Sequence, residues 1–495
     1  MRNELHYFFA PRSIAVIGAS SQVDSPGYVI FKNLLDNRRA GVLKARVYGV
    51  NIKGGVSLGE KLYRSVTEIP DEIDHAVIAI PAKFIPDVLD ECGRKNVKVV
   101  TIISGGFSEI GNVELENNVR EIGKKYGLRI IGPNGLGVYD PYTGVDTLFI
   151  PKSKDVDGKE MINLARPPRG FVAFLTQSGA LGGALLDYLC GENLGISKFV
   201  SWGNKIDVDE IDMLEYLKDD PNTRVVAIYV EALKERAREF VRIGREFTLI
   251  KPIVILKGGI TEAGARATQT HTASLAGDYA IYIGAFKHMG AVIVESVMEL
   301  MDASKALALQ PPARGRNIGI ISNGGGPGII TADLLEKRGL RVPPLSDDTL
   351  RELKQAVNEG IIPTIATFAN PIDISGTATD EAYVRATELV LNDENIDLVI
   401  ILALHHPPTL TSKLPDKLIS VVKDSKKPVL VMDIGLGELS EYVRRRFEAS
   451  NIPAYALPIR VVNGACALVN YGEYLARRGA LDEYIEKWSP PRISG

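Results

Sequence analysis

Short apolar runs that end in small-residue turns organise the first part of the chain. Such runs fall at residues 13–17, 47–50, 76–80, 99–103 and 129–131. Apolar runs of this length without polar alternation are typical of parallel strands buried on both faces. Residues 28–35, after Pro26-Gly27, carry apolar side chains at helical spacing instead. The pattern predicts an α/β domain over residues 1–150, with its ligand beyond the carboxyl ends of the strands.

A second α/β domain is predicted over residues 165–305. Apolar runs at residues 171–175, 224–230, 251–256 and 291–294 indicate strands of a flavodoxin-like sheet, which we expect to have five strands. Residues 180–189 form an apolar helix directly after the first run. Residues 151–169 are rich in charge, proline and turn residues, which predicts a linker or a flexible flap between the two domains.

The third part of the chain repeats the second. Residues 318–335 align without gaps on residues 172–189, and Lys427-Pro-Val-Leu-Val repeats the pattern of Lys251-Pro-Ile-Val-Ile. The alignment places Gly325, Gly328, Asp333 and Leu335 on Gly179, Gly182, Asp187 and Leu189. We therefore expect a second flavodoxin-like domain over residues 315–470, followed by a C-terminal helix and tail over residues 471–495.

Composition excludes several classes of protein. The 495 residues are 45% hydrophobic and 24% charged, with a net charge of −3, which argues against a general binder of nucleic acid or anionic membranes. No apolar stretch is long enough to span a bilayer, and the amino terminus mixes charges into its apolar residues, so no signal peptide is expected. Cys92, Cys190 and Cys466 lie in no metal-like spacing, which favours a reduced, cytoplasmic setting.

The turn after the first strand, Gly18-Ala19-Ser20, opens a Rossmann-like nucleotide site. A nicotinamide site would place an acidic side chain after the second strand, but this chain has Asn51-Ile52-Lys53-Gly54-Gly55 there. A lysine beside glycines suits a phosphate-rich ligand such as coenzyme A, although a solvated turn lysine is the alternative. An oxidoreductase that uses a nicotinamide cofactor is therefore disfavoured.

Two helix starts have the form of anion sites. Thr176-Gln177-Ser178-Gly179 joins a predicted strand to a predicted helix, so an anion would meet unpaired N–H groups, the helix dipole and the Ser178 hydroxyl. The repeat supplies a second start at Gly324-Gly325-Gly326. An ordinary capped helix is the alternative for either turn.

His271 lies in the stretch Arg266-Ala-Thr-Gln-Thr-His-Thr-Ala-Ser-Leu-Ala-Gly277, after the run at residues 251–257, so we expect it on a loop beyond a strand end. Glu231 follows the strand at residues 224–230 and should lie at the same edge. A carboxylate there can hold one ring nitrogen of His271 and leave the other nucleophilic. The alternatives are a surface histidine and a solvated strand-end glutamate.

The His-Thr-Ala-Ser-Leu-Ala-Gly run resembles the phosphohistidine loop of the NDP-forming acyl-CoA synthetases, which are relatives of succinyl-CoA synthetase. Gly18-Ala19-Ser20, Ser104-Gly105-Gly106-Phe107 and Gly132-Pro133-Asn134 are similar to signatures of that family's coenzyme A-binding domain. The resemblance covers nearly the whole chain. It implies a Rossmann-like coenzyme A-binding domain followed by two succinyl-CoA synthetase-like domains.

The same resemblance implies roles for individual residues. His271 would carry a phosphoryl group, held by Glu231 and by the helix starts at Ser178, Gly179, Gly324, Gly325 and Gly326. Asn134 would lie near the thioester. The remaining residues expected to line the coenzyme A site are Gly18, Ala19, Ser20, Asn51, Lys53, Pro81, Ser104 and Gly105. The chain departs from its relatives at Gly135, where they usually have cysteine, which bears on the size of the acyl pocket.

Other parts of the enzyme should lie on a partner. The sequence has no Walker-type phosphate loop and no recognisable ATP-grasp domain. The resemblance therefore implies an α subunit that works with an ATP-grasp β subunit, as in an α2β2 assembly, with ATP or ADP and Mg²⁺ bound through the partner. His405-His406 lacks further ligands at useful spacing, so we expect no metal site in this chain.

The activity implied is the reaction of a small carboxylic acid, such as acetate, with coenzyme A and ATP to give acyl-CoA, ADP and phosphate. It would proceed through an acyl phosphate and a phosphohistidine. A non-catalytic regulatory protein that binds coenzyme A or acyl-CoA on the same scaffold is the alternative.

Overall fold

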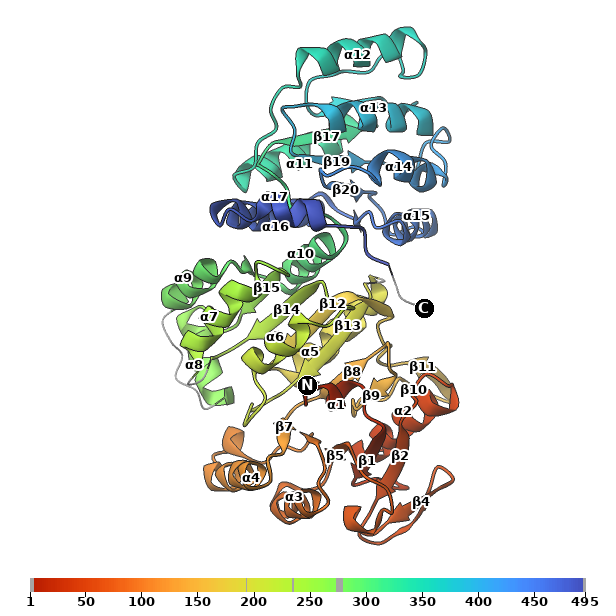
Figure 1. The fold of residues 1–495 in the computed structure, drawn as a ribbon. Coiled ribbons are helices and arrows are strands. Elements are labelled where there is room, and N and C mark those ends of the chain that lie inside the picture. The colour runs from red at the N-terminus through yellow and green to blue at the C-terminus, as the bar shows by residue number, and fades with distance from the viewer. Residues whose placement is uncertain (1–3, 193, 234–235, 273–278, 493–495) are drawn as a thin grey trace. The chain divides into compact units, whose positions relative to one another are not determined.

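The computed structural model describes residues 4–192, 194–233, 236–272 and 279–492, and for residues 269–272 it describes the backbone only. The chain divides into two compact units (Figure 1). The first holds Met1–Phe247 and Ile255–Met289, and the second holds Thr248–Val254 and Gly290–Gly495. In the described residues, no helix combines the length and apolarity needed to cross a membrane.

The first sheet of unit 1 has the strand order β3-β4-β2-β1-β5-β6-β7. All neighbours pair in parallel except β3 and β4, which form an antiparallel edge. Every residue of β1 and β5 is buried, as predicted from their continuous apolar runs. The strands are β1 (Ser13–Ile17), β2 (Arg46–Val50), β3 (Gly55–Ser57), β4 (Glu60–Tyr63), β5 (His75–Ile78), β6 (Val99–Ile102) and β7 (Arg129–Ile131).

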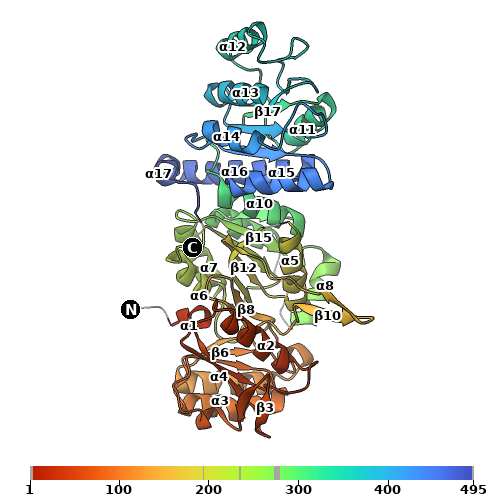
Figure 2. The ribbon, with the colours of Figure 1, turned by 90° about the vertical axis from the view of Figure 1, so that its right-hand side faces the viewer.

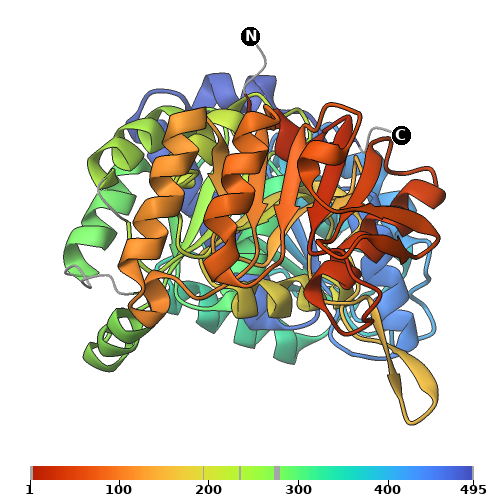
Figure 3. The same ribbon diagram turned by 90° about the horizontal axis from the view of Figure 1, so that it is seen from below.

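Four helices accompany this sheet: α1 (His6–Phe9), α2 (Pro26–Arg39), α3 (Ile85–Arg94) and α4 (Val113–Tyr126). Figure 3 shows α3 and α4 side by side over the strands. The two helices can approach closely because residue 93 is glycine. A Cβ on Gly93 would lie 2.2 Å from the Tyr126 ring, so only glycine leaves room for this ring. α2 begins with Pro26 behind the cap of Ser25, whose Oγ accepts a hydrogen bond from the Tyr28 N–H at 3.3 Å.

The strands of the second sheet that unit 1 contains run in the order β15-β14-β12-β13-β8-β9. Its strands are β8 (Gly137–Asp140), β9 (Val145–Asp146), β12 (Arg169–Thr176), β13 (Ile196–Ser201), β14 (Val225–Val230) and β15 (Ile253–Lys257). Its helices are α5 (Gly179–Gly191), α6 (Glu210–Lys218), α7 (Ala237–Phe247), α8 (Glu262–Thr272) and α9 (Tyr279–Met289). The core strands are parallel, as the apolar runs predicted.

The expectation of five strands in this sheet was wrong. β8 pairs antiparallel with β13, and β9 pairs antiparallel with β8, so residues from the end of the first predicted domain extend the second sheet. The segment between β9 and β12 contains an antiparallel hairpin of β10 (Ser153–Val156) and β11 (Lys159–Ile162). Figure 2 shows this hairpin projecting from the strands of unit 1, in keeping with a flap rather than a plain linker.

Unit 2 is built on a five-stranded sheet of order β18-β17-β19-β20-β21. The strands of this unit are β16 (Val292–Val294), β17 (Ile318–Ser322), β18 (Ile372–Asp373), β19 (Leu398–Leu402), β20 (Val429–Met432) and β21 (Ala454–Tyr455). Its helices are α10 (Val297–Leu309), α11 (Gly325–Lys337), α12 (Asp347–Asn358), α13 (Asp380–Asn392), α14 (Leu414–Val422), α15 (Glu438–Ala449), α16 (Pro458–Arg477) and α17 (Leu481–Lys487). All pairs within this sheet are parallel.

Candidate coenzyme A and phosphate site

The glycine turn after β1 brings backbone close to backbone. Gly18 has φ +102°, and a Cβ there would lie 2.3 Å from the Ala79 carbonyl oxygen. A Cβ on Gly27, at the start of α2, would lie 2.0 Å from the Gly18 carbonyl oxygen. Both positions therefore require glycine. The result is a helix start held directly against the turn, which is the arrangement that binds phosphate groups.

The loop after β2 is joined to this turn. The Asn51 side chain donates to the Ala19 carbonyl at 2.8 Å and accepts from the Lys53 N–H at 3.0 Å. The Ser57 hydroxyl donates to the Ser20 carbonyl at 2.6 Å. Gly18, Ala19, Ser20 and Asn51 thus form one connected edge, with the Lys53 side chain exposed beside it. None of these five residues lines the large cavity described next.

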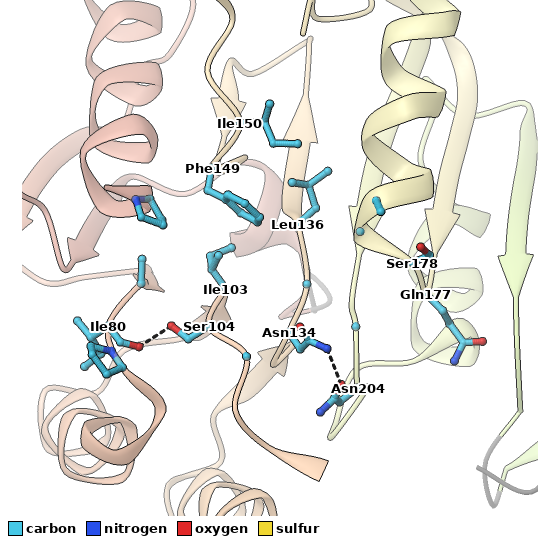
Figure 4. Close-up of a pocket in the computed structure, with 18 residues that line it drawn as sticks. Ile80, Ile103, Ser104, Asn134, Leu136, Phe149, Ile150, Gln177, Ser178 and Asn204 are labelled. Carbon is cyan, nitrogen blue, oxygen red and sulfur yellow. Dashed lines mark hydrogen bonds between the residues drawn. The ribbon is translucent and has the colours of Figure 1, made fainter. Parts of the chain in front are cut away.

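A cavity of about 710 Å³ lies between the two sheets of unit 1. Four expected coenzyme A residues, Pro81, Ser104, Gly105 and Asn134, share its wall with the α5 start at Ser178 and Gly179 (Figure 4). The Ser104 hydroxyl is fixed by donation to the Ile80 carbonyl at 2.6 Å. The other lining residues are Pro26, Ala79, Ile80, Ile103, Gly135, Leu136, Phe149, Ile150, Gln177, Ala180, Gly203 and Asn204.

One part of the cavity wall is apolar. Figure 4 shows Ile103, Leu136, Phe149 and Ile150 grouped between the Ser104 loop and the start of α5. Ile150 is held against that helix, since a Cβ on Gly183 would lie 3.2 Å from its Cδ1. The described residues that line the cavity include no lysine, arginine, histidine, aspartate or glutamate. A ligand with an uncharged apolar group therefore fits this wall better than a ligand that brings a carboxylate to it.

Gly135 leaves no extra space in the wall. A Cβ at this position would lie 2.4 Å from the Ser201 carbonyl oxygen, at the end of β13. The volume that a side chain would occupy is taken by backbone, so the missing side chain does not enlarge the acyl pocket. The departure at Gly135 instead accompanies a close approach between the loop after β7 and the end of β13.

The start of α5 is held by its own polar side chains. The Ser178 hydroxyl accepts from the Leu181 N–H at 3.2 Å, which is the N-cap bond. The Thr176 hydroxyl accepts from the Ser178 N–H at 3.2 Å and donates to the Ser178 carbonyl at 2.9 Å. These bonds fix the first turn of the helix at the cavity, where its N-terminal dipole favours an anion.

Glu231 follows β14 and is 8% exposed. The Gln177 side chain accepts from the backbone N–H groups of Glu231 at 2.5 Å and Ala232 at 3.0 Å, which joins the α5 start to the end of β14. Lys257 Nζ donates to the Glu231 carbonyl at 2.7 Å. Burial lowers the pKa of Lys257, although the Glu231 charge acts in the opposite direction. The carboxyl ends of β14 and β15 and the start of α5 thus bring together the Glu231 carboxylate, the Gln177 amide and the Lys257 ammonium group.

The backbone of His271 belongs to the last turn of α8, which begins beyond the carboxyl end of β15. The expectation of a loop at this histidine was therefore wrong, since the polar residues before it continue the helix. The His271 side chain lies outside the described residues, as do residues 273–278, which make up most of the matching motif.

Unit 2 repeats the same turn at Gly324-Gly325-Gly326, before α11. The Ser322 hydroxyl accepts from the Gly324 N–H at 3.0 Å and donates to its carbonyl at 2.7 Å, as Thr176 does with Ser178. Asn323 corresponds to Gln177, because its side chain accepts from the Leu404 N–H at 3.1 Å and donates to the Leu404 carbonyl at 3.0 Å. Leu404 therefore occupies the place of Glu231, and the second copy has no carboxylate there.

His405 follows Leu404 and is buried. Its Nδ1 lies 2.9 Å from Asp433 Oδ2, which identifies a buried histidine–aspartate pair that sequence reasoning missed. His406 adds no further ligand to it. Among the described residues, no group of three or more histidine, cysteine, aspartate or glutamate side chains is placed to hold a metal ion.

Comparison with known protein families assigns a class to each part of the chain. Residues 12–141 match the model of a CoA binding domain. Residues 169–307 match that of a succinyl-CoA ligase like flavodoxin domain, and residues 318–470 match that of a Ligase-CoA domain. The fold and the cavity thus define an α/β protein of the succinyl-CoA ligase type, which confirms the predicted fold class.

Known relatives narrow the class. The chain is 38% identical to the Acetate--CoA ligase [ADP-forming] II subunit alpha of Pyrococcus furiosus, over 94% of this chain and 97% of that protein. It is 36% identical to the Acetate--CoA ligase [ADP-forming] of Methanocaldococcus jannaschii, over 98% of this chain but 65% of that protein. The chain therefore belongs to the α-subunit family of the ADP-forming acyl-CoA ligases, as its motifs predicted.

A solved structure agrees with this assignment. The dinucleotide forming acetyl-coenzyme A synthetase 1 of Ca. Korarchaeum cryptofilum, in complex with phosphate and ADP, is 35% identical and superposes with a TM-score of 0.84. The match covers 99% of this chain and 100% of that one.

Proposed function

We propose that this chain is the α subunit of an ADP-forming acyl-CoA synthetase, which interconverts acid, coenzyme A and ATP with acyl-CoA, ADP and phosphate. The observation that carries the proposal is the cavity of about 710 Å³ in unit 1. It joins the strand-end loops expected to hold coenzyme A, at Ser104 and Asn134, to a helix start suited to phosphate, at Ser178. The two reactants of the first step, thioester and phosphate, would thus meet in one place.

In the direction of ATP synthesis, a phosphate oxygen attacks the thioester carbonyl, the C–S bond breaks, and coenzyme A leaves as the thiol. A ring nitrogen of His271 then attacks the phosphorus of the acyl phosphate, and the carboxylate leaves. Finally ADP takes the phosphoryl group and frees the histidine. Division into one acyl transfer and two in-line phosphoryl transfers lets groups bound at different sites react in turn. Glu231 would orient the His271 ring, and Ser178 and Gly179 would bind the transferred phosphoryl group.

Apolar monocarboxylic acids are the substrate class that the cavity favours, with acetate among the smallest. Ile103, Leu136, Phe149 and Ile150 offer a surface for an aliphatic or aryl group. A dicarboxylate would bring a second charge to a wall without a basic side chain among its described residues, at a desolvation cost of several kcal/mol.

The nucleotide and its Mg²⁺ would be held by an ATP-grasp β subunit, in an α2β2 assembly. The absence of a Walker loop from the sequence supports a separate partner. So does the length of the M. jannaschii relative, of which about a third has no counterpart in this chain. The Gly324-Gly325-Gly326 turn of unit 2 is proposed as a further phosphate site. That this turn and the α5 start both bind the same phosphohistidine stays a prediction. A cytoplasmic location fits three free cysteines.

The test is reconstitution of this chain with its ATP-grasp partner, followed by ATP formation from ADP, phosphate and a panel of acyl-CoA thioesters. We expect turnover with acetyl, branched and aryl thioesters and little with succinyl-CoA. Thermal shifts of the isolated chain with coenzyme A and with NAD provide a control for binding. Coenzyme A binding without turnover of any thioester would favour a regulatory protein instead.

A further inference from the structure

A short segment after β13 links the two sheets of unit 1. The Asn204 N–H donates to the Pro133 carbonyl at 2.9 Å, and the Ile206 N–H donates to the Gly132 carbonyl at 3.2 Å. Gly203, with φ +55°, lies so close that a Cβ there would be 2.2 Å from the Asn134 carbonyl oxygen. This segment is therefore packed against the loop that carries Asn134 at the cavity.

Both polar atoms of the Asn204 side chain make hydrogen bonds. Its Nδ2 donates to Glu109 Oε2 at 2.7 Å, to Glu116 Oε2 at 2.8 Å and to the Ser108 hydroxyl at 3.3 Å. Its Oδ1 accepts from Asn134 Nδ2 at 3.3 Å (Figure 4). One amide group thus contacts two carboxylates on one side and the Asn134 amide on the other.

Glu109 in turn holds the loop that lines the cavity. Its Oε1 accepts from the Gly106 N–H at 2.5 Å and from the Phe107 N–H at 3.1 Å. A Cβ on Gly105 would lie 3.0 Å from Asn134 Oδ1 and 3.1 Å from Glu109 Oε1, so both side chains touch this loop. Burial acts to raise the pKa of Glu109, but bonds from Asn204 and these N–H groups outweigh it and lower the pKa.

We propose that Asn204 is a positioning residue of the thioester site, which orients the Asn134 amide and, through Glu109, the Ser104–Phe107 loop. The inference rests on the proposed function, because it assigns the residue that sets the geometry of its first step. Asn204 need not touch the substrate itself. It acts through Asn134 and through the loop. Asn134 and the loop residue Gly105 both line the cavity.

The chemistry of the site explains why an amide is needed. Glu109 and Glu116 bring two carboxylates within hydrogen-bond distance of one nitrogen, and an amide is a neutral donor that can join them. The nearby positive charge is Arg120, 3.9 Å from Glu116 Oε1, whereas Lys205 is paired with Glu210 at 2.5 Å. An aspartate at position 204 would place a third carboxylate here and replace attraction with repulsion.

The experiment compares Asn204→Asp with wild type in the reconstituted complex, from pH 6 to pH 8.5. Repulsion should lower kcat/KM for acyl-CoA by at least about tenfold at pH 8, which is about 1.4 kcal/mol. The activity should recover as pH falls, because a proton then bridges the carboxylates. Asn204→Asp/Glu109→Gln exchanges the amide and the carboxylate and should restore part of the activity at pH 8, because Glu116 still faces the new carboxylate. Asn118→Asp, on the exposed face of α4, adds the same charge as a control and should leave activity unchanged.

A second readout separates this inference from the proposed function. The affinity of the chain for coenzyme A, measured by calorimetry, should follow the same pH profile in Asn204→Asp even if the wild-type complex makes no ATP. Absence of turnover in wild type would overturn the function alone. Wild-type kinetics in Asn204→Asp, or a loss that neither low pH nor the exchange variant restores, would overturn the role of Asn204.

Discussion

At the scale of single residues, the two flavodoxin-like copies differ where chemistry would need them to differ. Gln177 and Asn323 each accept a hydrogen bond from a backbone N–H beyond the neighbouring strand, that of Glu231 and that of Leu404. The residue whose N–H makes this bond is nevertheless a glutamate in unit 1, Glu231, and a leucine in unit 2, Leu404. At these two positions only Glu231 carries a carboxylate, which supports the proposal that it orients His271.

The close approach at Gly135 makes a residue-scale prediction. Gly135→Ala should destabilise unit 1 by about 1–3 kcal/mol, because its Cβ would overlap the Ser201 carbonyl and force the strand end to move. Hydrogen exchange of β8 and β13 amides measures the loss of protection. Gly284→Ala in α9, where a Cβ would meet open space, is the matched control and should not destabilise. Equal protection in both variants would contradict the overlap.

His75 predicts a pH dependence of stability. It is fully buried, and its Nε2 lies 2.8 Å from the Thr101 hydroxyl oxygen. Burial lowers its pKa from 6.5 to about 3, although Asp74 acts in the opposite direction, so the folded chain holds the ring neutral. Its contribution to stability is complete above pH 6.5 and falls by about 1.4 kcal/mol per pH unit below that, because only the unfolded chain then takes up the proton.

The measurement is hydrogen exchange of β5 amides at pH 7.0 and pH 5.5, corrected for the intrinsic exchange rate. His75→Gln removes the titration and should flatten the decline, even if it lowers stability at both values. An unchanged slope in this variant would show that another group governs the acid sensitivity of the sheet.

At the scale of elements, two helices start in the same way. In each, the hydroxyl group of the last strand residue makes hydrogen bonds to the turn before the helix. α5 and α11 both begin after a strand whose last residue, Thr176 or Ser322, bonds the turn before the helix. The cap differs, with Ser178 in the first copy and Gly324 in the second. Both starts leave first-turn N–H groups without partners within the helix, so each can bind an anion.

Substitutions of Ser178 can distinguish its role as the N-cap of α5 from a role of the α5 start in anion binding. Aspartate and asparagine are both good N-caps, so Ser178→Asp and Ser178→Asn should keep the stability of α5 within a few tenths of a kcal/mol. The aspartate places a negative charge where phosphate should bind, so the KM for phosphate should rise at least about tenfold in Ser178→Asp, with a much smaller change in Ser178→Asn. Equal phosphate kinetics in the two variants would remove the α5 start from the reaction.

The central parallel strands of each sheet could be predicted from sequence because their buried faces leave continuous apolar runs. β13 was missed because it buries Ser197 and Lys198, and nonlocal partners compensate for them. The Ser197 hydroxyl lies 2.7 Å from that of Thr223, and Lys198 pairs with Asp140 and Asp220 at 3.1 and 3.3 Å. β8 and β9 are short, and β8 pairs with β13 while β9 pairs with β8, so no local pattern marks them.

The candidate site divides in the same way. Gly18, Ser104 and Ser178 could be found because turn chemistry after a strand is local. Asn204 and the apolar wall at Phe149 were missed, because their roles depend on segments far away in the sequence. The helical backbone at His271 was also missed, since the residues before it are small and polar and lack an apolar period.

At the scale of the whole molecule, the chain combines three regions matched by family models, at residues 12–141, 169–307 and 318–470. The cavity lies entirely within unit 1, so in the proposed function this unit would bind both reactants of the first step. The later transfer to ADP requires a nucleotide site, which the proposal assigns to a second subunit. The histidine in α8, His271, would connect these two halves of the proposed reaction.

Labelling of the reconstituted complex with γ-³²P-ATP tests that claim most directly. We predict an acid-labile, base-stable label on this chain, which peptide mapping assigns to His271. The label should be lost in His271→Ala while the affinity for coenzyme A stays at the wild-type value. A label that persists in His271→Ala, or that maps to another residue such as His405, would contradict the account.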